Sequence, residues 1–404
     1  MNIKINLMRN LDYWVGRPIC FILSTINFFI KIFINKEKLT NLPKNILFIK
    51  PSEIGSIILS YPLMKKVKED HKDAKLFFLT FKSNKDILKI LNIIPFENII
   101  ELNDRSLLVF IIDTVKAISR MHKEKIDTTI DLEFFSRFTS IISYLSGASC
   151  RVGFHKYSFE GLYKGNLLTH KIQSNPHIHV TRQFFAFSQT LTATKKDSPD
   201  LKNVPDISHF VLPKYSIDSK QKENTYNMLA KHGVTYGSKL FLINPGEGLI
   251  PLREWPLNNF IYVVNKLLEN PDHYVIIVGT SDCLLKTSEL INKLDNDRII
   301  NLCGKTSIKE LLNLFDIGKA LIINDSGLSH LASLTTIKQF VFFGPETPNI
   351  FAPLTKNAHI FYSKLPCSPC LSAYNHRKSC CKSNECLKII APSESYCAIE
   401  KYLN

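Results

Sequence analysis

Hydrophobic and polar positions alternate along most of this chain in a pattern that predicts strands followed by helices. Short apolar runs such as NILFIK (45–50) and YVIIV (274–278) have the length of buried strands, whereas residues 57–68 and 257–268 carry apolar side chains at helical spacing. Such alternation is typical of α/β domains with parallel sheets and right-handed crossovers. Further strands are expected at 74–81, 99–102, 126–132, 151–154, 239–244, 299–302, 321–323 and 340–343, and further helices at 86–91, 107–121, 141–145, 181–191 and 308–315.

The alternation occurs twice, and a polar stretch of linker composition, TKKDSPDLKNVPD (194–206), separates the two series. We therefore expect two Rossmann-like domains of parallel sheet, at 45–215 and 216–365, preceded by a segment 1–44 and followed by a tail 366–404. Ligands of such sheets bind beyond the carboxyl ends of the strands, so a cleft between the two halves is the expected site.

The N-terminal segment contains an uncharged apolar stretch, PICFILSTINFFI (18–30), between Arg17 and Lys31. Thirteen residues are short for a membrane span, and no small-residue cleavage site follows them. We expect an amphipathic helix lying on an anionic membrane surface. A helix packed on the protein's own core and a short membrane span are the alternatives. The basic and aromatic residues around the stretch include Lys4, Arg9, Trp14, Phe28, Phe29, Lys36 and Lys38.

The net charge of +15 indicates an anionic partner, which is a lipid surface, a phosphorylated substrate or nucleic acid. The basic residues are scattered between apolar elements and form no dense block, and no nucleic-acid-binding module is recognisable. We therefore expect no nucleic-acid partner. A hydrophobic content of 45% is typical of a soluble globular protein with ample material for two cores.

Three turns of the second series place a glycine where a strand passes into a helix. In LIINDSGLSHLASLT (321–335) the strand runs into Asn324-Asp325-Ser326-Gly327, and His330 follows one helical turn later. Backbone N–H groups at such a helix start can bind an anion, and an ordinary N-cap by Asp325 or Ser326 is the simpler alternative.

The other two turns are NPGEG from Asn244 and GPET from Gly344, and each glycine lets the backbone approach a ligand closely. Arg253 stands just ahead of a helix start, where it either pairs with a diphosphate or forms a surface salt bridge.

Taken together, these motifs resemble glycosyltransferase family 9, the bacterial heptosyltransferases. The resemblance implies a GT-B fold, with two Rossmann-like domains facing a central cleft. It also implies transfer of a sugar, heptose by the family's name, with inversion, from a nucleotide-diphosphate sugar such as ADP-heptose to a lipopolysaccharide-core or related glycolipid acceptor. The similar segments are NPG from Asn244, REWP from Arg253, GKTSIKEL from Gly304, NDSGLSHLA from Asn324, FFGPETP from Phe342, ILFIKPSEIGSIILSYP (46–62) and the tail from Cys367.

The resemblance places the donor site in the second half of the chain. Helix N–H groups together with an arginine can stabilise a departing nucleoside diphosphate without a metal, so we expect neither a metal nor a cofactor. The acidic pair in Asp295-Asn296-Asp297 is interpreted as a solvated helix-to-strand turn. The donor-binding residues expected from the resemblance are Asn244, Gly246, Arg253, Asp325, Ser326, Gly327, His330 and Gly344.

The first half departs from the family pattern in the turn after its opening strand. The family's turn typically ends Gly-Asp, and that aspartate resembles a base for the acceptor hydroxyl, whereas this chain has Gly55-Ser56. A serine is no general base without help, and Glu53 supplies a carboxylate in the same turn. We expect Glu53 and Ser56 to be catalytic, with Ser52 and Gly55 on the acceptor side.

Two alternatives to this assignment stay open. The base is supplied from elsewhere, by Asp131 or Glu133, or the protein is a non-catalytic relative that binds nucleotide-sugar or glycolipid as a scaffold. A nucleotide-sugar epimerase or dehydrogenase is disfavoured because PSEIGS (51–56) lacks a GxGxxG turn.

Six of the ten cysteines lie in the tail. With no cleavable signal we expect a cytoplasmic protein, peripheral on the inner face of the bacterial inner membrane, where a reducing environment disfavours disulfides. Reduced thiols are the favoured state, and a structural metal or an occasional disulfide are the alternatives. His376, Arg377 and Lys378 either contact an anionic acceptor or lipid or form a solvated loop. The six tail cysteines are Cys367, Cys370, Cys380, Cys381, Cys386 and Cys397.

Overall fold

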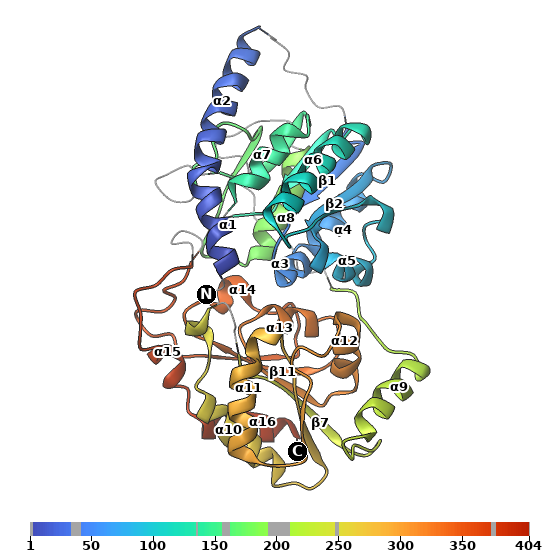
Figure 1. Ribbon diagram of the computed structural model, residues 1–404, viewed down its shortest axis with the longest axis vertical. Helices are drawn as coiled ribbons and strands as arrows, with labels where there is room; N and C mark the ends of the chain where they lie inside the picture. Colours follow the sequence, from blue (N-terminus) through green and yellow to red (C-terminus); the bar gives the residue numbers. More distant parts are fainter. Residues whose placement is uncertain are drawn as a thin grey trace. The chain divides into compact units, whose positions relative to one another are not determined.

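The chain forms two compact units in the computed structural model, Asn2–Val211 and Leu212–Asn404, which we call the N-terminal and C-terminal units. Each contains one parallel sheet of six strands (Figure 1). This confirms the expected α/β class with two Rossmann-like domains. The structure describes residues 3–33, 42–134, 136–155, 162–192, 211–246, 250–372 and 377–403, so the expected linker at 194–206 lies outside the described residues.

The sheet of the N-terminal unit has the strand order β3-β2-β1-β4-β5-β6. The chain runs outward from β1 to β3 and then returns to β4, so the strand order reverses between β1 and β4. Side chains beyond the carboxyl ends of these two strands therefore lie at the position where open sheets bind ligands. The strands are β1 (Asn45–Ile49), β2 (Lys75–Phe81), β3 (Ile99–Leu102), β4 (Thr128–Asp131), β5 (Cys150–His155) and β6 (His170–Gln173).

Helices cover both faces of this sheet. The single helix expected at 57–68 is instead two helices, because Pro62 lacks an N–H and starts a new helix after Ser60. On one face Phe110, Ala117 and Met121 of α6 and Phe138 and Ile142 of α7 pack against β1, β2 and β3. The helices are α3 (Ile54–Leu59), α4 (Tyr61–Asp70), α5 (Lys85–Leu91), α6 (Leu107–Lys123), α7 (Arg137–Leu145) and α8 (Val180–Thr192), with short 3-10 turns at Lys82–Asn84 and Phe96–Asn98.

Two N-terminal helices, α1 (Ile3–Trp14) and α2 (Gly16–Phe33), lie against α7. Asp12 accepts hydrogen bonds from the backbone N–H groups of Arg137 (2.7 Å) and Phe138 (3.0 Å) and pairs with the Arg137 guanidinium at 3.0 Å, so α1 caps α7. In the described part of the chain, one helical stretch, Leu7–Ile30 with a mean hydropathy of 1.3, is long and apolar enough to cross a membrane. Lys36 and Lys38 lie outside the described residues.

The sheet of the C-terminal unit has the order β12-β11-β10-β7-β8-β9, which reverses between β7 and β10. Of the four edge strands of the two sheets, β6 and β12 were not expected from the sequence, because β12 is only partly buried and β6 contains two buried positions among four. The strands are β7 (Lys239–Asn244), β8 (His273–Ile277), β9 (Ile299–Asn301), β10 (Ala320–Asn324), β11 (Lys338–Phe343) and β12 (Ala358–Tyr362).

The tail is part of the core of the C-terminal unit. Leu387, Ile390 and Ile399 pack in the same apolar cluster as α10 and β11. The turn from Asp295 links a helix end to β9, as expected. The helices are α9 (Ser219–Ala230), α10 (Leu257–Leu268), α11 (Leu284–Leu294), α12 (Ile308–Ile317), α13 (Gly327–Ala332), α14 (Pro348–Phe351), α15 (Glu385–Lys388) and α16 (Pro392–Leu403), with 3-10 turns at Pro251–Arg253 and Ser281–Cys283.

All ten cysteines have free thiols. Within the described ranges, no group of three or more His, Cys, Asp or Glu side chains is arranged to hold a metal ion.

Candidate functional site

The turn between β1 and α3 holds the expected acceptor-side residues, and Glu53 is at its centre. Glu53 has φ 67° and ψ 92°, a left-handed backbone conformation that costs a residue with a side chain on the order of 1–3 kcal/mol. Ser56 Oγ donates a hydrogen bond to Glu53 Oε2 at 2.9 Å, and Lys50 Nζ lies 3.4 Å from the same oxygen. A strained residue whose carboxylate is held by two neighbours is a candidate functional group.

Behind this turn lies a buried network of charges from β1, β4 and the loop before β6. Lys50 Nζ is 2.8 Å from Glu133 Oε2, and Ser52 Oγ donates to Glu133 Oε1 at 2.9 Å. Lys164 Nζ lies 3.5 Å from Asp131 Oδ2 and donates to the Glu133 carbonyl at 2.7 Å. The network links Ser52 to the point between β1 and β4 at which the strand order reverses. Its charges are stable in this buried position because they are paired.

The structure separates the three candidate bases by their exposure. Asp131 is fully buried and accepts hydrogen bonds from Thr139 (3.0 Å) and Ser140 (2.9 Å). Glu133 is 5% exposed and engaged by Lys50 and Ser52. The Glu53 side chain is 35% exposed, so of these three carboxylates it is the one that a hydroxyl from outside can reach most readily. Gly55 is buried in the first turn of α3.

In the C-terminal unit, four charged side chains meet at the carboxyl ends of β10 and β11. Arg253 Nε lies 3.4 Å from Asp325 Oδ2, and its Nη2 lies 3.8 Å from Glu346 Oε2. Arg377, from the tail, places Nε 3.0 Å from Glu346 Oε1. The two carboxylates are nearly inaccessible and the two guanidinium groups are 12% and 14% exposed, so the arginines form the outer side of the cluster.

The burial of this cluster changes the acidity of Asp325. Removal from water disfavours the carboxylate and raises the pKa of Asp325 from 3.8 to about 7, with Arg253 acting in the opposite direction and Glu346 adding to the rise. Near neutral pH the carboxyl group of Asp325 therefore exists in both protonation states. An anion that enters beside the two arginines favours the protonated one.

Asparagines on two neighbouring strands hold the Arg253 segment in place. Asn324 Oδ1 accepts from the Trp255 backbone N–H at 2.8 Å, and its amide donates to the Pro245 carbonyl at 3.2 Å. Asn244 Oδ1 accepts from the Gly246 backbone N–H at 3.1 Å. The Trp255 ring stacks on Phe342 at 4.0 Å and donates through Nε1 to the Ile390 carbonyl at 3.0 Å. Trp255, two residues after Arg253, is thereby held by Asn324, Phe342 and the Ile390 carbonyl.

The helix after β10 offers a weaker anion-binding site than its sequence indicates. Ser326, rather than Asp325, caps it by accepting from the Leu328 backbone N–H at 3.2 Å. The helix α13 has only six residues, so its dipole is small. Gly327 is exposed at its start, and His330 is 6% exposed one turn later.

Two of the expected donor glycines have packing roles. A Cβ atom at Gly246 would lie 2.8 Å from Cys283 Sγ, and one at Gly344 would lie 2.5 Å from Leu387 Cγ. Both glycines therefore allow other parts of the same unit to pack closely against the turns. The sequence had predicted that a ligand would occupy this space. Gly344 in particular makes room for the tail.

Four members of these clusters were not predicted from the sequence in this role, namely Lys50, Lys164, Glu346 and Arg377 as a donor-side residue. The signal for Glu346 was present in the FFGPETP motif, where only Gly344 was singled out. Arg377 was expected at an acceptor, a lipid surface or a solvated loop, and the structure instead places its guanidinium against Glu346. A contact between residues this far apart in the chain leaves no local pattern.

Two Rossmann-like parallel sheets with charged turns at the carboxyl ends of their strands are the architecture of the GT-B class of glycosyltransferases. The fold is similar to that of the ADP-heptose lipopolysaccharide heptosyltransferase II of Escherichia coli, with a TM-score of 0.68, 18% identity and coverage of 89% of this chain and 98% of that one. It is also similar to a family 9 glycosyltransferase from Veillonella parvula, with a TM-score of 0.70, 17% identity and coverage of 90% and 98%.

The chain belongs to glycosyltransferase family 9 (heptosyltransferase), whose model matches residues 116–380. Lipooligosaccharide heptosyltransferase 2 of Campylobacter jejuni is 28% identical over 173 residues, which are 41% of this chain and 52% of that protein. The chain thus spans about half the length of the curated relatives that it matches first. The matched range includes the Arg253 cluster and begins after Glu53.

Proposed function

We propose that this protein is an inverting, metal-independent glycosyltransferase that moves heptose from ADP-heptose to a hydroxyl of a lipopolysaccharide-core or related glycolipid acceptor. The observation that carries the proposal is the Arg253–Asp325–Glu346–Arg377 cluster, which lies inside the family-matched range at the carboxyl ends of β10 and β11. The printed name of the E. coli relative, which includes ADP-heptose, supports the choice of donor.

The donor half of the reaction needs charge stabilisation. As the bond between the anomeric carbon and the diphosphate oxygen breaks, negative charge develops on the departing ADP. Arg253 and Arg377 can pair with that charge in a largely water-excluded site, where such pairs contribute most. Protonation of Asp325 reduces the competing negative charge beside Arg253 and eases the entry of the diphosphate. Asn244, Gly246, Ser326, Gly327, His330 and Gly344 would shape the surrounding turns.

The acceptor half needs a base, and we assign it to Glu53. Its carboxylate removes the proton of the acceptor hydroxyl while the oxygen forms a bond to the anomeric carbon on the face opposite the leaving ADP. Ser56 and Lys50 orient the carboxylate through their contacts to Oε2, and Lys50 joins it to the buried network through Glu133. Ser52 and Gly55 would line the acceptor side of the same turn. The central cleft expected between the two halves remains a prediction.

We also propose a cytoplasmic location, peripheral on the inner membrane, and the docking of the N-terminal helices supports the peripheral position. α2 uses Gly16, Cys20 and Asn27 to contact the rest of the N-terminal unit, while Phe21 and Phe28 on its other side are exposed by 64% and 59%. Together with the cap by Asp12 this docking favours a helix pair lying in the membrane interface over one crossing the bilayer, because a span would have to leave these contacts.

The test is transfer itself, with ADP release and the mass of the product as readouts. Purified protein is incubated with ADP-heptose and with lipopolysaccharide from a strain whose core lacks heptose. We expect Glu53→Gln to lower turnover by about a hundredfold or more while the Kd for ADP-heptose is unchanged. The exposed Glu69→Gln serves as the matched control and retains wild-type turnover.

Two results would contradict the proposal. Wild-type turnover by Glu53→Gln would refute the assignment of the base and direct attention to another group. Tight binding of ADP-heptose by the wild type, with no transfer to any core acceptor, would instead establish a non-catalytic scaffold. The Gly55-Ser56 departure from the family pattern is the feature that makes this second outcome worth testing.

A further inference from the structure

The outward face of α6 is apolar over its first half. Leu108 is 74% exposed, Ile112 52% and Val115 62%, and they lie at helical spacing on one side of the helix. Ile111 is also about half exposed, whereas the inward residues Ala117 and Met121 are buried against the sheet. A soluble protein rarely exposes contiguous apolar side chains of this size without a partner.

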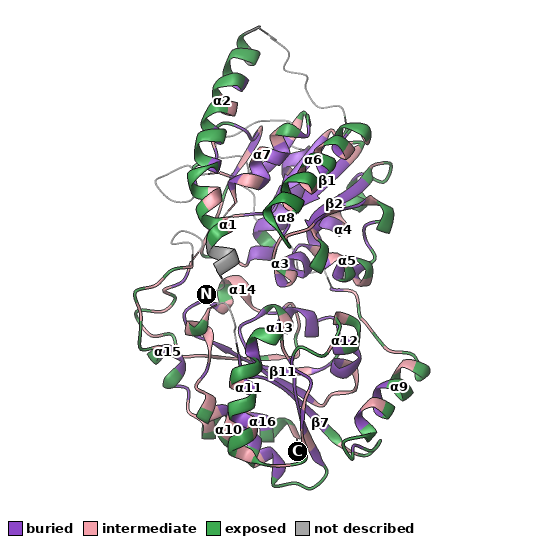
Figure 2. Cartoon of the chain, in the orientation of Figure 1, coloured by how far each residue is buried: buried purple, intermediate pink, exposed green. Residues whose placement is uncertain are grey.

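This face lies on the same side of the N-terminal unit as the N-terminal helices. α6 and α7 cover the same face of the first sheet, and Phe110 of α6 contacts Phe138 of α7 with their ring centroids 4.9 Å apart. α2 in turn packs on α7. The helix order across this side is therefore α6, α7, α2, and Figure 2 shows exposed residues along both outer helices with the more buried α7 between them.

Both apolar faces also begin near the catalytic edge of the sheet. α6 starts five residues after the carboxyl end of β3, and Phe110 contacts Phe81 at the carboxyl end of β2. α7 starts beyond the carboxyl end of β4, and Asp12 at its first turn places the α1–α2 junction there. The carboxyl ends of parallel strands share one edge, and Glu53 follows β1 at that edge.

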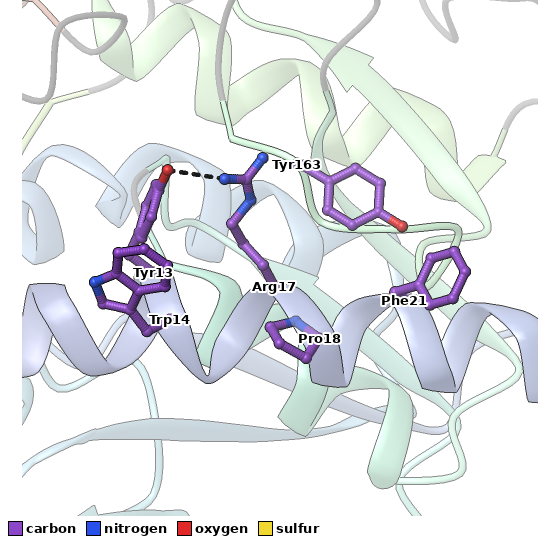
Figure 3. Close-up of a pocket in the computed structure, with 6 residues that line it drawn as sticks. All are labelled: Tyr13, Trp14, Arg17, Pro18, Phe21 and Tyr163. Carbon is purple, nitrogen blue, oxygen red and sulfur yellow. Dashed lines mark hydrogen bonds between the residues drawn. The ribbon is translucent and has the colours of Figure 1, made fainter.

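The side chains around these faces are those of a protein that binds a bilayer. At the α1–α2 junction, Arg17 donates to Tyr13 Oη at 2.9 Å and Trp14 is 73% exposed, so an amphipathic aromatic group stands beside a cation (Figure 3). This junction borders a groove of about 480 Å³ closed on its other side by Tyr163. Aromatic rings next to cations are typical of the lipid headgroup region.

Basic residues complete the match to an anionic bilayer. Arg105 precedes α6, and Lys116 and Lys123 continue its exposed side beyond Val115. The Lys116 side chain is 74% exposed, and its Nζ lies 3.9 Å from Asp113 Oδ1. Cations beside an apolar stripe attract acidic headgroups while the stripe enters the acyl region.

We propose, on the basis of the proposed transfer to a membrane glycolipid, that the first half of α6 and the outward side of α2 form one bilayer-binding face. Two lipid contacts, on the helices at either side of α7, hold the unit in a single orientation. The edge that carries Glu53 then lies close to the headgroups, where a glycolipid presents its sugar.

The first test measures insertion of α6 with tryptophan fluorescence. The chain contains two tryptophans, and Trp255 is only 1% exposed, so it forms a constant background. In the full-length double variant Trp14→Phe/Leu108→Trp, we expect a blue shift and quenching by brominated acyl chains on addition of phosphatidylethanolamine–phosphatidylglycerol vesicles. An unchanged spectrum at Trp14→Phe/Leu108→Trp would overturn the proposal.

The second test measures vesicle partition by flotation. We expect Leu108→Ser/Ile112→Ser to lower partition into the same vesicles about tenfold, and Phe21→Ser/Phe28→Ser to do likewise. Leu285→Ser is the matched control, because Leu285 is 87% exposed on α11 of the other unit, and its partition should equal that of the wild type. The proposal would be refuted if Leu108→Ser/Ile112→Ser partitioned into vesicles like the wild type. It would also be refuted if the wild type sedimented as a dimer and this variant as a monomer.

The bilayer-binding face and the proposed enzymatic function can be refuted independently of each other. On a delipidated core oligosaccharide, Leu108→Ser/Ile112→Ser should transfer heptose at the wild-type rate, whereas its rate on vesicle-bound acceptor should fall with its partition. Absence of transfer by the wild type on both acceptors would remove the enzymatic function and leave the vesicle measurements as they are. Equal loss of rate on both acceptors would show that α6 acts on the catalytic edge and would overturn its role at the bilayer.

Discussion

Asp325→Asn tests whether the donor cluster holds a carboxyl group that is costly to ionise. Asp325 has its pKa raised to about 7, so the stability associated with its neutral form is complete below pH 3.8 and is lost as the pH rises through 7. Raising the pKa of Asp325 from 3.8 to about 7 corresponds to about 4 kcal/mol in total, of which about 2 kcal/mol falls between pH 5.5 and 8.5. An asparagine does not ionise and avoids this loss.

We therefore expect the free energy of unfolding of Asp325→Asn, relative to the unsubstituted protein, to rise by about 2 kcal/mol from pH 5.5 to 8.5. Urea unfolding is followed by the fluorescence of Trp255 in a Trp14→Phe background, because Trp255 is stacked on Phe342 in the core of the same unit. The exposed Asp272→Asn is the control and should follow the unsubstituted protein at every pH. A difference between Asp325→Asn and its parent that stays constant with pH would refute the reasoning.

Three further substitutions test the two charged networks and the N-terminal helices. Lys50→Met should lower the free energy of unfolding by about 3–5 kcal/mol, because it leaves Glu133 buried without its cation, whereas the exposed Lys75→Met should have little effect in the same urea titration. Arg377→Gln should weaken ADP binding about tenfold by calorimetry, and equal weakening by the neighbouring, exposed Lys378→Gln would speak against a specific contact. Asp12→Ala removes the cap of α7 at a cost of about 1–2 kcal/mol, so hydrogen exchange in α1 should become faster, and unchanged exchange would contradict the docking by Asp12.

The central strands were predictable because each is a short run of apolar residues buried on both faces. β1, β7 and β10 appear close to the expected positions for this reason. The edge strands β3 and β9 were predicted, whereas the edge strands β6 and β12 were not, since neither of the latter two is a continuous buried apolar run. The break between α3 and α4 was missed although Pro62 marks it, because the apolar spacing continues across the break.

The sequence by itself determined the two-sheet architecture, the turns that carry Glu53, Arg253 and Asp325, and the family. These depend on local pattern and on the rule that parallel strands end at one edge. Only the tertiary structure decided the partners: Lys50 with Glu133, and Arg377 with Glu346. It also decided that the glycines Gly246 and Gly344 face the protein's own tail and helices. The reason is that a pairing between distant segments depends on packing of the whole unit, and no local spacing encodes it.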